Sequence, residues 1–311
     1  MTWLKKPNGT AKGKTALALG GGGVRGVAHL GVIHFLEENE LDRWDFLVGT
    51  SAGSIFGALF LLYGNVEQAR DRMATVIRSM KKSRGLLSVT SSKSNFLANI
   101  KEKLHTARSL LKLSIIDAEP LREFIVSLVG ETTTFSDLRK PLYVVATDLK
   151  SGRDVVFSRG ELLPALMATS SIPGVFPPVT YRGYHLVDGG ITHKLPTRIA
   201  YGLGARRVLG VDVGGGMMVR NRFSNPIEVI IRSEEIASQA LHDRNRDAVG
   251  LLLTPRFNDM KWYEFTRHPE AYEAGLKAAA ARGADLRRFF RPGLGRYRKT
   301  PICTEENFIL E

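Results

Sequence analysis

Within its first 63 residues the chain twice repeats an apolar run, a glycine-rich turn and a helical pattern, and this repeat most constrains its fold. The first copy covers Thr15–Glu38 with its turn at Gly20–Gly23, and the second covers Asp45–Tyr63 with its turn at Gly49–Ser54. Buried strands that alternate with helices through tight turns are typical of an α/β fold with a mainly parallel sheet.

The rest of the chain fits the same fold class. Strands are predicted at 141–147, 154–157, 177–179, 184–187, 207–213 and 251–254, and helices at 66–80, 119–129, 162–170 and beyond 226. We expect one domain over residues 15–280, between an N-terminal tail at 1–14 and a basic C-terminal tail at 281–311.

The charge of the chain narrows the choice of partner. A net charge of +13 and a pI near 9.9 indicate an anionic partner. No helix-turn-helix, zinc-finger or RNA-binding signature is present, so a membrane surface or an acidic substrate is favoured over nucleic acid. The single cysteine, Cys303, fits a reducing compartment. Since no apolar run reaches the ~20 residues of a membrane span, we expect a cytoplasmic protein that contacts the membrane peripherally.

Gly49-Thr50-Ser51-Ala52-Gly53 in the second turn has the pattern G-x-S-x-G. Small residues on both sides allow a sharp strand-to-helix turn in which the serine hydroxyl stands clear of the backbone at a helix N-terminus. The apolar strand before the motif and the apolar helix after it predict that Ser51 is a nucleophile. An ordinary packing joint between a strand and a helix is the alternative.

The first turn, Gly20–Gly23 followed by Val24-Arg25-Gly26, brings several backbone N–H groups together at a helix N-terminus. Acyl transfer needs such donors at the oxygen that becomes negative. The residues predicted to form this oxyanion hole are Gly21, Gly22, Gly23, Val24, Arg25 and Gly26. Arg25 could also fix the loop or neutralise an anionic head group.

Two phosphate-binding motifs are alternative interpretations of glycines near the N-terminus, and both are disfavoured. The dinucleotide fingerprint at Gly21–Gly26 requires an acidic residue at the end of the second strand, whereas Asp45 stands at its start. Residues 9–15 are one residue short of a P-loop and precede a strand instead of following one.

Asp188-Gly189-Gly190 follows an apolar run and holds a carboxylate at the end of a predicted strand. A serine hydroxyl needs a neighbouring base to take its proton. None of the seven histidines stands in an arrangement that marks it as this base, although His185 and His193 flank the aspartate. Asp188 is therefore the favoured base, while an ordinary D-G-G turn is the alternative.

Taken together and in this order, the three motifs resemble those of the patatin-like phospholipase family. Residues 168–179 (ATSSIPGVFPPV) resemble the segment that precedes the aspartate in that family. Residues 253–278, with Trp262, Phe265 and Ala274-Gly275, resemble the bacterial branch related to the catalytic domain of neuropathy target esterase. The resemblance covers roughly residues 15–280.

The resemblance implies a three-layer α/β/α sandwich and hydrolysis of phospholipids, lysophospholipids or other acyl lipids. It implies a serine–aspartate dyad of Ser51 and Asp188, an acyl-enzyme on Ser51, and no metal or cofactor. An acyltransferase or thioesterase with the same nucleophile, or a non-enzymatic basic membrane-binding protein, remains open. Acyl-chain length, head group and oligomeric state are not predicted.

Residues 78–112 contain nine basic residues and one acidic residue, a net charge of +8, with apolar residues at near-helical spacing. A basic amphipathic helix can lie on an anionic bilayer. This segment is predicted to be a lid or a membrane-docking element. A solvated helix that packs on the sheet by its apolar side is an equally favoured alternative.

Overall fold

Nine strands form one mixed sheet in the computed structural model, which describes residues 14–82, 114, 116–214, 223, 226–246, 249–291 and 309–311. The strands are β1 (Thr15–Leu19), β2 (Phe46–Thr50), β3 (Leu142–Asp148), β4 (Asp154–Phe157), β5 (Val179–Tyr181), β6 (Tyr184–Asp188), β7 (Arg207–Val211), β8 (Leu251–Leu253) and β9 (Ile309–Leu310). Their order is β5-β6-β3-β2-β1-β7-β8, with β4 beside β3 and β9 beside β4. The run from β3 to β8 is parallel, whereas β4, β5 and β6 enter antiparallel pairs.

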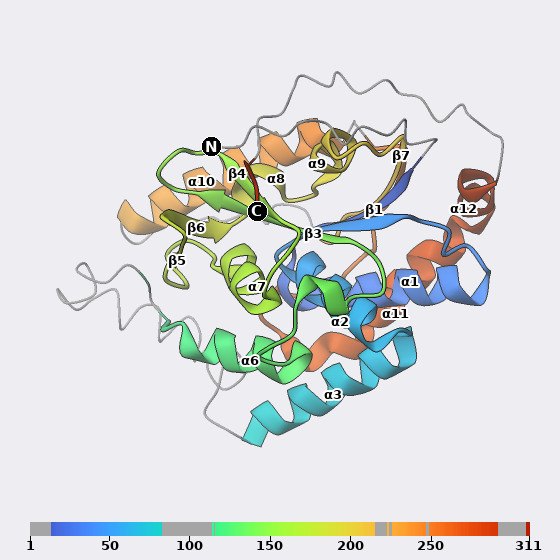
Figure 1. Cartoon of the computed structure of the whole chain (residues 1–311), viewed down its shortest axis with the longest axis horizontal. Coiled ribbons are helices and arrows are strands. Elements are labelled where there is room, and N and C mark those ends of the chain that lie inside the picture. The colour runs from blue at the N-terminus through green and yellow to red at the C-terminus, as the bar shows by residue number, and fades with distance from the viewer. Residues whose placement is uncertain are drawn as a thin grey trace.

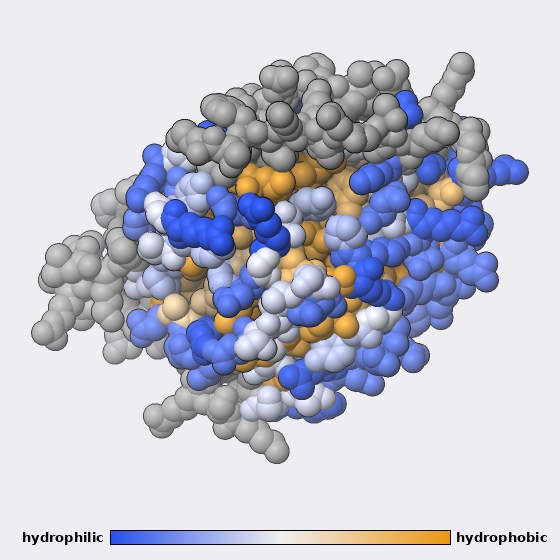
Figure 2. All heavy atoms as spheres, in the orientation of Figure 1, coloured by the Kyte–Doolittle hydropathy of each residue, from blue (hydrophilic) through white to orange (hydrophobic). Residues whose placement is uncertain are grey.

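Helices cover both faces of the sheet and complete a three-layer α/β/α sandwich (Figure 1). They are α1 (Ala28–Glu38), α2 (Ala52–Tyr63), α3 (Val66–Lys82), α6 (Glu119–Val129), α7 (Leu162–Ser170), α8 (Gly190–His193), α9 (Thr197–Gly202), α10 (Pro226–Arg246), α11 (His268–Ala281) and α12 (Gly283–Phe290). In Figure 1, α1, α2, α3, α6 and α11 lie below the sheet, and α8, α9 and α10 lie above it. Figure 2, in the orientation of Figure 1, shows hydrophilic residues at the sides of this view and hydrophobic residues exposed between them.

Side-chain alternation along the strands divides the core between the two faces. Leu17 and Leu19 of β1 belong to the larger apolar cluster, which includes α1, α2, α6 and α11. Ala16 and Ala18 belong to the smaller cluster, which includes residues of α9. Both faces of the central strands are therefore buried, which explains their continuous apolar sequences.

The register of β3 brings the ends of two other strands together. β2 and β4 both pair with Val144 and Val145, and β4 and β6 both pair with Ala146 and Thr147. A strand has only two edges, so β2 and β6 share one edge of β3 and approach each other from opposite directions. β2 ends at Thr50 opposite Val145, and β6 ends at Asp188 opposite Ala146. The chain therefore leaves both strands at the same point of the sheet.

The predicted strands and helices agree with the observed ones to within a few residues, and the α/β fold class is confirmed. The predicted domain limits stay a prediction, but two elements beyond residue 280 join the domain. Leu286 and Phe289 of α12 are fully buried, and β9 pairs with β4. Most of the predicted lid or docking segment, residues 78–112, lies outside the described residues, as does Cys303. No helix in the described ranges is long and apolar enough to cross a bilayer.

Candidate active site

Ser51 occupies the sharp turn between β2 and α2. Its backbone has φ 52° and ψ −124°, a left-handed φ that non-glycine residues rarely adopt. The flanking glycines make this turn possible. A Cβ at residue 53 would lie 2.2 Å from the carbonyl oxygen of Leu19, and one at residue 49 would lie 2.6 Å from the amide nitrogen of Ser54. The G-x-S-x-G spacing is thus required by close packing of the backbone around the serine.

Thr169, near the end of α7, connects the Ser51 turn to β3. Its Oγ1 accepts a hydrogen bond from the Ser51 N–H at 2.8 Å and donates one to the carbonyl oxygen of Val145. Thr169 is fully buried. The backbone of the candidate nucleophile is therefore held by a specific side chain as well as by the turn.

Asp188 ends β6 at the point of β3 where β2 also ends. Its N–H donates to the Ser171 carbonyl oxygen at 2.9 Å, and its Oδ1 accepts the Gly190 N–H at 2.7 Å. A Cβ at Gly189 would lie 2.4 Å from the Val145 carbonyl oxygen, so the turn passes close to β3. Asp188 is 7% exposed and Ser51 is 9% exposed. The structure therefore brings the predicted nucleophile and the predicted base to one edge of the sheet.

The glycine-rich loop passes directly beside Ser51. A Cβ at Gly21 would lie 3.1 Å from the Ser51 Cβ. The N–H groups of Gly21 and Val24 are already bonded, to the carbonyl oxygens of Lys194 and Trp262. The N–H groups of Gly22 and Gly23 have no acceptor within the described part of the chain. Of the predicted oxyanion-hole residues, these two have N–H groups available for a ligand.

The same loop is held in place by His29 of α1. The His29 Nε2 lies 2.8 Å from the Gly20 carbonyl oxygen, and the ring is fully buried. Burial lowers the pKa of His29 to about 4. The ring is consequently neutral at pH 7, and its Nε2–H donates to Gly20. This role could not be predicted from the sequence, because a histidine within a helical pattern gives no indication of its hydrogen-bond partner.

Two cations, Arg25 and Lys194, lie at the loop and near each other. The Arg25 Nε donates to the Gly22 carbonyl oxygen at 3.3 Å, so Arg25 braces the loop, as the sequence allowed. Burial lowers the pKa of Arg25, whereas the nearby Asp212 carboxylate opposes that shift. Burial and, after it, the charge of Arg25 also lower the pKa of Lys194. Asp212 itself is bound to His242 Nε2 at 3.0 Å and to the Gly214 N–H.

The two histidines that flank the aspartate are occupied elsewhere or face away. His193 Nδ1 lies 3.1 Å from Asp154 Oδ2, and its carbonyl oxygen accepts the Thr50 hydroxyl. His185 stands three positions before Asp188 on β6, so its side chain projects from the opposite face of the strand.

Asp45, the acidic residue considered for a dinucleotide site, accepts the Thr15 N–H at the start of β1. No cluster of three or more potential metal ligands occurs among the described residues.

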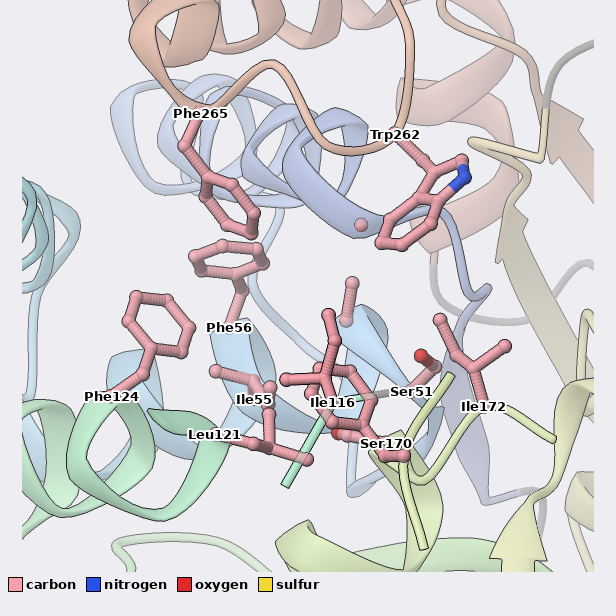
Figure 3. A pocket seen from close by; sticks show the side chains of 13 residues that line it. Ser51, Ile55, Phe56, Ile116, Leu121, Phe124, Ser170, Ile172, Trp262 and Phe265 are labelled. Atoms are coloured by element: carbon pink, nitrogen blue, oxygen red, sulfur yellow. The ribbon is translucent and has the colours of Figure 1, made fainter. Parts of the chain in front are cut away.

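An apolar pocket opens on the other side of Ser51 (Figure 3). Its empty volume is about 590 Å³, including the part open to solvent, which lies in the range of ligand pockets. Ile55 and Phe56 of α2, Leu121 and Phe124 of α6, and Trp262 lie along it. Among the described residues that line it, only Ser51 and Ser170 carry a hydroxyl side chain. The pocket therefore suits a hydrocarbon chain that ends in a polar group at Ser51.

The sequence model of the patatin-like phospholipase family matches residues 17–201, more than half of the chain. The chain therefore belongs to the patatin-like phospholipase family, a class of lipid hydrolases. Among curated relatives, an uncharacterised NTE family protein of Mycobacterium tuberculosis is 34% identical over 228 residues, which cover 70% of this chain and 54% of the relative.

Lysophospholipase NTE1 of Mycosarcoma maydis is 29% identical over 205 residues, which cover 64% of this chain and 10% of that protein. The chain thus spans about half the length of the mycobacterial relative and a tenth of the fungal one. Among solved structures, VipD from Legionella pneumophila aligns with a TM-score of 0.40 at 12% identity, covering 86% of this chain and 67% of VipD.

Proposed function

We propose that this protein hydrolyses acyl esters of phospholipids or lysophospholipids, with Ser51 as nucleophile and Asp188 as general base. The observation that carries the proposal is the shared edge of β3, where Ser51 directly follows the end of β2 and Asp188 ends β6, beside an apolar pocket. Family membership supports a lipid ester as substrate. The name of the fungal relative supports a lysophospholipid.

In the first half of the reaction, the Asp188 carboxylate takes the proton of the Ser51 hydroxyl. The Ser51 Oγ attacks the ester carbonyl carbon, and the carbonyl oxygen becomes negative. The N–H groups of Gly22 and Gly23 stabilise this oxygen. The tetrahedral intermediate then collapses, the Asp188 carboxylic acid gives its proton to the leaving alcohol, and an acyl ester remains on Ser51.

In the second half, Asp188 takes a proton from water, which attacks the acyl carbon. The same oxyanion donors stabilise the second intermediate. Its collapse releases the fatty acid and returns the proton to the Ser51 oxygen. Asp188 Oδ1 keeps the bond from the Gly190 N–H, which orients the carboxylate for both proton transfers.

The test uses the purified full chain with a fluorophosphonate probe, a medium-chain nitrophenyl ester and a lysophospholipid. We expect the probe to label Ser51 and both esters to be hydrolysed. Ser51→Ala should abolish labelling, and Asp188→Asn should lower kcat by at least about a thousandfold. Ser54→Ala, which alters a buried serine one turn further along α2, serves as the matched control. Activity retained by Ser51→Ala, or labelling at another serine, would refute the proposal.

Peripheral contact with an anionic membrane is a separate part of the proposal, and the charge of +13 supports it. Sedimentation with vesicles that contain phosphatidylserine should remove the protein from solution at low salt. Zwitterionic vesicles should not bind the protein, because they carry no net negative charge. High salt should release it from the anionic vesicles, because salt screens the surface charges. Equal binding to both kinds of vesicle would contradict the electrostatic part of this interpretation.

A further inference from the structure

We infer that the aromatic pair Phe124–Phe265 closes the far end of the apolar pocket and thereby limits the length of the acyl chain. The inference rests on the proposed function, because it takes Ser51 as the point where the ester is bound. It adds a determinant of substrate choice that neither the motifs nor the family match assign.

The placement of the pair within the pocket is the first argument. In Figure 3, Ser51 lies at one side of the pocket, whereas Phe124 and Phe265 lie at the opposite side. Ile55 and Leu121 lie between these two ends. An acyl chain whose ester is held at Ser51 would therefore extend along Ile55 and Leu121 toward the two phenyl rings.

The contact between the two rings is the second argument. Their centroids are 5.6 Å apart with an interplanar angle of 69°, an edge-to-face arrangement. Phe124 is only 3% exposed, and it lies one turn after Leu121 on α6. Phe265 begins the 3-10 turn η4 (Phe265–Arg267), more than a hundred residues further along the chain. Two separate segments thus meet at this end of the pocket.

The attachment of the Phe265 segment is the third argument. The carbonyl oxygen of Trp262, three residues before Phe265, accepts the Val24 N–H at 2.8 Å. This bond ties the pocket wall to the glycine-rich loop beside Ser51. Because the wall is fixed relative to the nucleophile, the distance from Ser51 to the rings sets one maximum chain length.

The expected dependence on chain length follows from the burial of methylene groups. Each methylene that enters the pocket should raise kcat/KM by about fourfold. Once the chain reaches the two rings, a further methylene should give no gain or a loss. Phe265→Ala makes room for about two more methylenes, so the kcat/KM ratio of long to medium chains should rise about sixteenfold.

The experiment measures kcat/KM of the full chain with nitrophenyl esters and 1-acyl lysophospholipids of increasing even chain length. We compare the wild type with Phe265→Ala, Phe124→Leu and Phe265→Trp. Both truncations should move the optimum to longer chains, whereas Phe265→Trp should move it to shorter ones. Phe35→Ala is the matched control, since Phe35 is a half-buried phenylalanine of α1 outside the pocket. Thermal unfolding of each variant shows whether it is folded.

A second measurement separates this inference from the proposed chemistry. Saturated fatty acids of the same lengths are titrated into Ser51→Ala protein against a fluorescent fatty-acid probe. The gain in affinity per carbon should stop at the same length as in the kinetic series, and Phe265→Ala should extend it. Chain-length profiles that are identical in all folded variants would overturn the inference. If the protein hydrolysed no ester but the gain in fatty-acid affinity per carbon still stopped at one chain length and extended in Phe265→Ala, only the proposed function would be overturned.

Discussion

The two sides of Ser51 differ in how they are built. On the polar side, individual hydrogen bonds fix the glycine-rich loop and the Asp188 turn: His29 donates to the loop, the Lys194 carbonyl oxygen accepts from it, and the Gly190 N–H donates to Asp188. On the apolar side, the pocket is formed by aliphatic and aromatic side chains of α2, α6 and the segment before α11. Directional bonds fail when one atom is misplaced, whereas apolar contacts adjust to changes that conserve volume. The polar side should therefore be much less tolerant of substitution.

The largest contrast is expected between Gly23 and Ile55. Gly23 has φ +60°, and a Cβ there would lie 2.3 Å from the Trp262 carbonyl oxygen, so Gly23→Ala must shift the loop. We expect kcat to fall by about 10²–10³, as for loss of an oxyanion donor. Ile55→Val, on the apolar side, should change kcat by less than about threefold. Steady-state kinetics of the two variants make the comparison.

Gly204→Ala is the control for backbone strain alone. Gly204 has φ +96°, but no atom lies within 4 Å of the position that a Cβ would take. Its substitution should lower thermal stability and leave kcat unchanged. If Ile55→Val reduced kcat as much as Gly23→Ala, the contrast between the two sides would be broken.

Acidification should lower the free energy of unfolding through protonation of His29, which holds the polar side of the site. Its pKa of about 4 lies below the ordinary value of 6.5, so between these pH values the unfolded chain binds more protons than the folded one. The free energy of unfolding contributed by His29 is therefore fully present above pH 6.5 and is lost as pH falls toward 4. From pH 6.5 to 5 the loss should be about 2 kcal/mol. Denaturant unfolding at both pH values measures it.

His29→Gln is the matched variant, because glutamine keeps an N–H donor but does not titrate in this range. Its stability should change less between pH 6.5 and 5 than that of the wild type. An identical pH dependence in both proteins would show that His29 does not couple protonation to the loop.

Thr169 gives a smaller effect on the polar side. Thr169→Val keeps the shape but leaves the Ser51 N–H and the Val145 carbonyl oxygen without their partner. The cost should be about 1.5 kcal/mol of stability, with a fall in kcat of about tenfold. Thr169→Ser retains the hydroxyl and should restore most of both quantities. A Thr169→Val protein with wild-type kcat would mean that the turn alone holds Ser51.

The polar side was also the more predictable one from sequence. Its glycines and Asp188 are local motifs, because a sharp turn or a close backbone approach permits few residue types. The carbonyl partners of the loop, from Lys194 and Trp262, could not be predicted, because any residue supplies a carbonyl oxygen. Thr169 lies in a segment noted for its family resemblance, but its bond to Ser51 depends on the packing of α7 against β3 and β6.

The apolar side could not be assembled from sequence at all. Leu121 and Phe124 are ordinary apolar residues of a helical segment, and Phe265 was noted only for a family resemblance, so the tertiary fold alone shows that they line one pocket with Ser51. The strands were predictable from apolar runs and turns, since both faces of the sheet are buried. The shared edge of β3 was not, because register depends on pairing between distant segments. α12 was missed because the basic residues around it suggested a tail, and β9 was missed because a strand of two residues gives no periodic pattern.

The smallest effect is expected at Ser170, a polar residue on the apolar side. Its Oγ is buried and has no hydrogen-bond partner among the described residues. Ser170→Ala should therefore raise the free energy of unfolding by up to about 1 kcal/mol, since it removes an unsatisfied polar group. It should leave kcat/KM within about twofold of the wild type. Ser171→Ala is the control, because the Ser171 hydroxyl donates to the Met167 carbonyl oxygen and its loss should destabilise. A tenfold fall in kcat/KM for Ser170→Ala would instead indicate that this hydroxyl contacts the bound ester, and the polar chemistry would then extend into the pocket.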